Sequence, residues 1–131
     1  MPVIAASMSQ PENPPEALTP AGQRALDLFE RAALDAYGDV LVQLVLFGSR
    51  SRSEARPDSD IDVAVVLREL RDRRADRDRL ADLAYEAIVE TGMDIHAMPI
   101  SLDEWEHPEH HANPALIRAI KCDGVVVSSK R

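Results

Sequence analysis

Cysteine and aromatic side chains are scarce in this sequence. One of the 131 residues is a cysteine, Cys122, and aromatic residues make up 4%. A single cysteine cannot close an intrachain disulfide, so a disulfide-stapled secreted scaffold is excluded. The core must then be built from Leu, Val, Ile and Ala, and we expect Cys122 to be a small apolar residue near a helix end.

Long apolar runs are also missing. No stretch approaches the roughly 20 residues that cross a bilayer. Residues 1–20 lack the basic region followed by an apolar core that marks a signal peptide. We therefore expect a cytoplasmic protein that makes no membrane contact.

Basic residues are outnumbered, 15 against 23 acidic ones, and the net charge is −8. Such a chain is poorly suited to gripping a polynucleotide directly, because neutralisation of phosphates dominates that binding. The expected partners are a small molecule or another protein. A nucleoside triphosphate could bind only through a local device such as a metal ion, a few arginines or backbone N–H groups.

Periodicity predicts one α/β (α+β) domain over 19–131, with a small mixed β-sheet flanked by helices. Residues 1–18 contain four prolines and read as a flexible leader. The spacing of apolar residues defines the helices and strands, and Pro, Gly and Ser/Thr residues mark where they begin and end. The expected order is a helix over 20–37, strands over 40–47 and 60–67, a helix ending at Gly92, a strand over 93–99, a short helix from Ser101, a helix from Asn113 to Gly124, and a strand over 125–127.

Two carboxylates open the second strand. Asp60 and Asp62 lie at i and i+2 and share one face, while Ile61 and Val63 share the other. Carboxylates so close repel each other and raise each other's pKa unless a cation lies between them. Hard oxygen ligands without a histidine or thiol partner favour Mg²⁺ or Mn²⁺.

A Gly-Ser corner ends the preceding strand. Glycine allows a close backbone approach, so the N–H groups and the serine hydroxyl there can face an anion. Arginines on the following loop can contact phosphate oxygens. If that loop folds back, phosphate cradle and metal ligands become neighbours. The candidate phosphate-binding residues are Gly48, Ser49, Arg50, Arg52 and Ser59.

Asp94 begins the third strand, as Asp60 and Asp62 begin theirs. A third carboxylate from an adjacent strand could hold a second metal and accept the proton of an attacking hydroxyl. Taken singly, a Gly-Ser pair is usually a turn, and a strand-end aspartate is usually a surface residue. Their occurrence together predicts a triphosphate site with catalytic and metal-binding Asp60, Asp62 and Asp94.

The stretch GSRSRSEARPDSDIDVAVVL resembles the core motif of the minimal nucleotidyltransferase (MNT) family in the DNA polymerase β superfamily. Asp94 in MDIHAM falls at that family's third acidic position, and NPALIRAIKCDGVVV is similar to the end of its short members. Ser51 and Ser53 depart from the Ala and Gly that the family commonly has there, which puts the shape of the phosphate loop in question.

The resemblance implies the nucleotidyltransferase fold and Mg²⁺-dependent transfer of AMP from ATP onto a hydroxyl, with release of pyrophosphate. Short members are similar to the antitoxins of MNT–HEPN toxin–antitoxin pairs, which adenylylate a tyrosine of a HEPN ribonuclease toxin. This implies a hetero-oligomer with a HEPN-type partner. Relatives that modify antibiotics or tRNA carry an acceptor-binding domain for which this chain has no room, so we expect the acceptor to be presented by another protein.

Two other functions stay open. The chain could be a non-catalytic nucleotide-binding module that neutralises a toxin by complex formation alone. It could also be a small-molecule nucleotidyltransferase of the aminoglycoside type.

Several polar features have simpler interpretations. His96 is expected to be a buried or half-buried histidine, although it can share a face with Asp94. The charged stretch 68–82 reads as a solvated helix face with pairs such as Glu69–Arg73. Three further histidines could bind zinc, but a solvated loop is the preferred interpretation for His107, His110 and His111.

Overall fold

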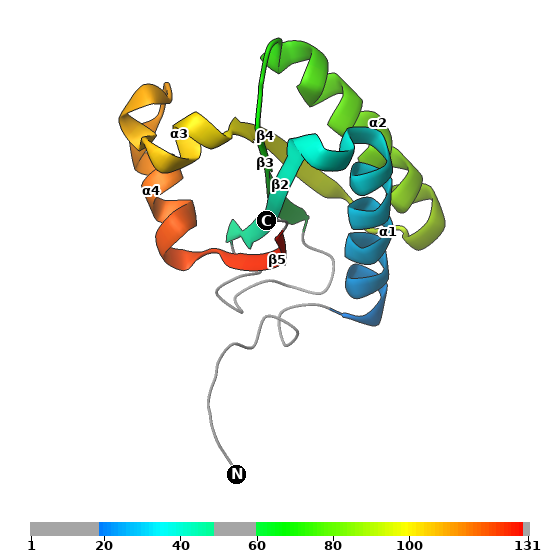
Figure 1. Cartoon of the computed structure of the whole chain (residues 1–131). Helices are drawn as coiled ribbons and strands as arrows, with labels where there is room; N and C mark the ends of the chain where they lie inside the picture. The colour runs from blue at the N-terminus through cyan, green and yellow to red at the C-terminus, as the bar shows by residue number, and fades with distance from the viewer. Residues whose placement is uncertain (1–18, 49–59, 130–131) are drawn as a thin grey trace.

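The computed structural model of the chain describes residues 19–48 and 60–129 (Figure 1). The predicted order of helices and strands is confirmed, with two added 3-10 turns. The elements are α1 (Pro20–Tyr37), η2 (Gly38–Val40), β2 (Leu41–Phe47), β3 (Ile61–Leu67), α2 (Arg73–Thr91), β4 (Ile95–Ser101), α3 (Leu102–Glu106), η4 (Pro108–His110), α4 (Pro114–Asp123) and β5 (Val125–Ser129). The expected leader, 1–18, lies outside the described residues.

Side chains cap the helices as the sequence predicts. The Thr19 hydroxyl accepts a hydrogen bond from the Gly22 N–H at 3.0 Å and begins α1. Ser101 and Glu104 form the predicted capping box of α3. Gly92 ends α2 with a φ of 79°, in the left-handed region. Cys122 lies near the end of α4 as expected, but it is exposed.

The predicted pairing within the charged stretch is wrong. Asp72 caps α2 by accepting from the Ala75 N–H at 3.1 Å, so Glu69 precedes the helix and does not face Arg73 along it. Arg73 instead forms an ion pair with Glu104 of α3 and donates to the Pro99 carbonyl at 2.9 Å. Those two contacts attach the start of α2 to the far end of β4 and to α3.

The sheet is mixed and has the strand order β4-β3-β2-β5. β3 and β4 are parallel, whereas β2 runs antiparallel to both β3 and β5. α2 connects the two parallel strands. Figure 1 shows α1 and α2 side by side on one face of the sheet, with α3 and α4 on the opposite side. β4 is therefore an edge strand of the described sheet, and α2 lies along it.

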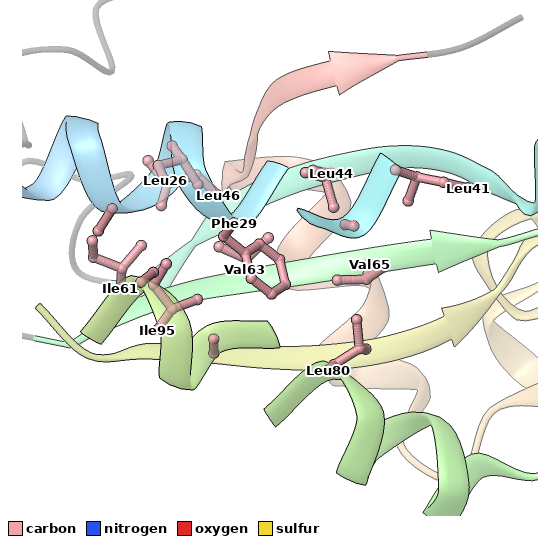
Figure 2. Packing of buried hydrophobic residues seen from close by; sticks show 14 of the residues in the cluster. Leu26, Phe29, Leu41, Leu44, Leu46, Ile61, Val63, Val65, Leu80 and Ile95 are labelled. Carbon is pink, nitrogen blue, oxygen red and sulfur yellow. The ribbon is translucent and has the colours of Figure 1, made fainter. Parts of the chain in front are cut away.

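The main core lies between the sheet and the α1–α2 layer. Phe29 of α1 is fully buried and packs beside Val63 and Leu80 (Figure 2). The inward side chains of β3 belong to this cluster, whereas Ala64 belongs to a smaller cluster with Ile117 of α4. The predicted two-faced alternation of β3 is thus confirmed, and Asp62 is on the α4 side.

None of the helices in the described part of the chain has the length and hydropathy needed to cross a bilayer.

Candidate active site

The parallel pairing of β3 and β4 brings the three predicted aspartates to one end of the sheet. Its register sets Asp62 opposite His96. The Ile61 N–H donates to the Asp94 carbonyl at 2.9 Å, which fixes the residue before β4 beside the start of β3. Asp60 and Asp94 each lie one residue before their strand, whereas the sequence predicted both inside the strands.

His96 lies among the three carboxylates. Its Nε2 atom is 3.1 Å from an Asp94 oxygen and 3.4 Å from an Asp60 oxygen, and its Nδ1 atom is 3.9 Å from an Asp62 oxygen. The His96 side chain is 58% exposed, so the expectation of a buried or half-buried histidine is wrong. The signal for its position was the two-residue spacing from Asp94, which places both side chains on one face of β4.

Gly48 is required at the end of β2 for two reasons. Its φ of 78° lies in the left-handed region, which side chains other than glycine rarely adopt. A Cβ atom built there would lie 2.6 Å from an Asp62 carboxylate oxygen. The Gly48 backbone therefore lies directly against the Asp62 carboxylate.

Asp62 is the least solvated of the three carboxylates. Its side chain is 35% exposed, compared with 51% for Asp60 and 45% for Asp94. Burial raises the pKa of Asp62, and the neighbouring Asp60 charge raises it further, while His96 acts in the opposite direction. A cation at this place would favour the ionised carboxylate.

The donor atoms fit a divalent cation. One ligand atom each from Asp60, Asp94 and His96 lie within 4.8 Å of one another. Asp62 lies beside this group, 3.9 Å from the His96 Nδ1 atom, but is not one of its three members. The register of β4 thus adds an imidazole to the oxygen donors predicted from the sequence. Carboxylates remain the majority donors, which suits Mg²⁺ or Mn²⁺.

Other predicted residues do not join this cluster or cannot be placed. Ser49, Arg50, Arg52 and Ser59 lie outside the described residues. His110 pairs with Asp103 at 2.8 Å, and the hydrogen bond and charge of that carboxylate raise the pKa of His110.

The histidines after α3 do not form a second metal cluster. His107 and His110 are exposed in or beside η4. Within 19–48 and 60–129, the aspartate–histidine cluster is the one group of three potential ligands close enough to hold a metal ion. The solvated-loop interpretation is the better one for these histidines.

The family model of the nucleotidyltransferase domain matches residues 26–123. The chain belongs to this nucleotidyltransferase family. The matched segment contains the Gly48 turn and all three aspartates. The mixed sheet with flanking helices is the fold expected from the sequence.

A relative from Methanocaldococcus jannaschii, named a "putative protein adenylyltransferase", is 38% identical over 71 residues, which are 53% of this chain and 48% of the relative. The chain thus spans about half the length of this curated relative.

Two solved structures share the fold, each with a TM-score of 0.55. One is a toxin–antitoxin with AMP-PNP, 21% identical, covering 79% of this chain and 73% of that one. The other is a mutant of the toxin–antitoxin MntA-HpeT, 20% identical, covering 81% and 73%.

Proposed function

We propose that this nucleotidyltransferase moves AMP from ATP onto a tyrosine hydroxyl of a partner protein, with Mg²⁺ or Mn²⁺, and acts in the cytoplasm as antitoxin to a HEPN-type ribonuclease toxin. The observation that carries the proposal is the convergence of Asp60, Asp62 and Asp94 beside the Gly48 turn. Three carboxylates at one end of the sheet, two of them grouped with His96 closely enough to share a cation, are suited to nucleotidyl transfer.

Each residue has a distinct role in the proposed reaction. Asp60 and Asp62 would hold the metal, with Asp94 as a further ligand. The ion would neutralise triphosphate charge as the α-phosphate is attacked. Asp94 accepts the proton of the acceptor hydroxyl. The hydroxyl oxygen forms a bond to the α-phosphorus, the bond from that phosphorus to the bridging oxygen breaks, and pyrophosphate leaves.

The nature of the acceptor is supported by charge and by the relatives. A net charge of −8 disfavours a polynucleotide acceptor. The M. jannaschii relative carries the name of a protein adenylyltransferase. The two solved structures with this fold are toxin–antitoxin proteins, one of them with an ATP analogue. A protein acceptor and a hetero-oligomer with a toxin agree with all three observations.

The test is adenylylation of the protein encoded beside this chain in its genome. Both purified proteins are incubated with Mg-ATP, and intact mass spectrometry measures whether the partner gains whole AMP units. We expect the gain with the wild type and its loss in Asp60→Ala/Asp62→Ala. The matched control is Asp78→Ala/Asp82→Ala, which removes the same charge from the exposed surface of α2.

Two results would contradict the proposal. If the Asp60→Ala/Asp62→Ala variant neutralises the toxin fully and no mass gain occurs with the wild type, the chain acts by complex formation alone. If the wild type modifies a free aminoglycoside without a protein partner, it is a small-molecule nucleotidyltransferase.

A further inference from the structure

We infer that the acceptor protein docks along the groove between α2 and β4, with its hydroxyl at the Asp94 end and an acidic side chain at the Arg77 end. This inference rests on the proposed protein adenylylation and names where that acceptor binds. The groove has a volume of about 360 Å³. The lining residues that carry the argument are Arg77, Ala81, Tyr85, Ile88, Asp94 and His96.

The groove opens directly on the site. Asp94 and His96 belong both to its lining and to the donor cluster at the start of β3. A chain lying in the groove therefore reaches the carboxylate proposed to accept the hydroxyl proton. Because a general base must lie within hydrogen-bond reach of the proton it accepts, the acceptor has to approach from a surface that Asp94 shares.

The groove has the dimensions of a peptide segment. α2 and β4 run in opposite directions, since Arg73 contacts Pro99 near the far end of β4. Arg77 and Ile88 are 11 positions apart along the helix, a distance of about 16 Å at 1.5 Å per residue. A segment of about five extended residues spans that length at roughly 3.3 Å per residue.

Charge is distributed unevenly along the groove. Arg77 is exposed, and within the described part of the chain it has no ion pair. The opposite end carries the Asp94 carboxylate. An acceptor with an acidic side chain several residues away from its hydroxyl-bearing residue is complementary to both ends. A polynucleotide would bring phosphates against Asp94 and against Glu86 and Glu90, which are exposed on the same helix.

The exposed apolar surface extends beyond the groove. Tyr85 and Val89 are large apolar side chains, yet they are 63% and 65% exposed. Tyr85 also lines a second groove between α1 and α2, of about 420 Å³, together with Val89. The apolar surface thus continues across α2 from one groove to the other. Exposed apolar patches of this kind mark protein interfaces.

The experiment measures docking separately from chemistry. In the Ala81→Trp variant an indole side chain fills the groove. In the Arg77→Glu variant the positive charge at the end of the groove becomes negative. The matched controls are Ala75→Trp and Arg74→Glu, exposed positions on the same helix that line neither groove. The acceptor is the partner protein used in the adenylylation test. Steady-state transfer gives KM and kcat for that protein, and calorimetry gives Kd for Mg-ATP and for the protein complex.

We expect both groove variants to raise KM and complex Kd for the acceptor about tenfold or more, with kcat and Mg-ATP affinity changed less than about twofold. The controls should match the wild type. Equal KM values in groove and control variants would overturn the docking inference while leaving protein adenylylation intact. If the wild type forms the complex but transfers no AMP, the proposed function fails, and the complex Kd values of the variants still decide the docking surface.

Discussion

Replacing Gly48 with alanine tests how closely the turn after β2 depends on Asp62. The φ of 78° should cost about 1–2 kcal/mol of stability for any residue with a Cβ. The new Cβ would also lie 2.6 Å from an Asp62 oxygen, where ordinary contact begins at 3.4 Å. The carboxylate or the turn must therefore shift by about 0.8 Å. A misplacement of about 1 Å at a reacting centre can lower the rate about 100-fold.

Gly92→Ala is the matched control. The φ of Gly92 is 79°, and a Cβ there meets nothing within 4 Å. Both variants therefore carry the same backbone strain, and only Gly48→Ala disturbs the site. Urea unfolding should show a loss of about 1–2 kcal/mol in each. Steady-state AMP transfer should fall about 100-fold in Gly48→Ala alone, and Mn²⁺ titration without nucleotide should show weaker binding in that variant.

The comparison of Gly48→Ala with Gly92→Ala shows whether the contact between Gly48 and Asp62 matters for activity. If Gly48→Ala keeps the transfer rate and Mn²⁺ affinity of Gly92→Ala, the close approach of the turn to Asp62 has no functional role. If both variants lose activity equally, backbone strain accounts for the effect and the argument from the Cβ position is wrong.

Three more predictions concern Asp62, His96 and the ion pair formed by Glu104. Asp62→Asn should stabilise the metal-free protein at pH 7 but not below about pH 4, because the folded-state pKa of Asp62 is raised and its ionisation destabilises the fold as the pH rises from the unfolded-state pKa of about 3.9 through the folded-state value. Mg²⁺ should then raise the melting temperature of the wild type more than that of the variant. Burial raises the pKa of Glu104, but the hydrogen bonds from Arg73 and the Ser101 N–H, together with nearby positive charge, lower it below its usual value. The stabilising contribution of Glu104 is therefore present above the unfolded-state pKa of about 4.3 and is lost as the pH falls through the folded-state value. In urea unfolding at pH 7, Glu104→Gln should cost about 1–3 kcal/mol and the exposed control Glu106→Gln less than about 0.5 kcal/mol; equal losses would contradict a role for the ion pair. His96→Ala should weaken Zn²⁺ binding in calorimetry about tenfold or more and Mg²⁺ binding little, since imidazole favours the later first-row metals; unchanged Zn²⁺ affinity would show that this histidine is not a ligand.

The elements could be predicted from the sequence because most carry a local signal. β3 is apolar except for Asp62, and the side chains predicted to share its other face (Ile61, Val63, Val65 and Leu67) all belong to the main core. β4 was predicted to end at Pro99 but continues to Ser101. Proline is tolerated there because β4 is an edge strand, with one side free of ladder partners in the described sheet. Strand order, which decides this, is not visible in the local sequence.

The start of α2 shows a second limit. The stretch 68–82 is charged throughout, so no apolar period marks where the helix begins. The deciding feature is the Asp72 side chain, which accepts the Ala75 N–H. Several aspartates in that stretch could have capped a helix, and only the packing of Arg73 against Pro99 and Glu104 distinguishes among them.

The residues of the candidate site were easier to predict where they lie close together in the sequence. Asp60 and Asp62 follow from strand alternation within three residues. Asp94 reaches the site only because two segments more than thirty positions apart pair as strands. In the sequence, only the family resemblance indicated that pairing. His96 was assigned a semi-buried place because a lone histidine beside an apolar strand usually packs; the parallel register turned it toward the carboxylates instead.

That register links the stability of the fold to the geometry of the site. The segments 60–62 and 94–96 each place an apolar residue between two ionisable ones. Ile61 and Ile95 are paired and buried, at 0% and 3% exposure. A slip of one residue would turn Ile95 out of the core and bring a charged neighbour into it. The pairing that buries both isoleucines therefore also sets the carboxylates beside His96, so hydrophobic burial holds the proposed metal ligands in place.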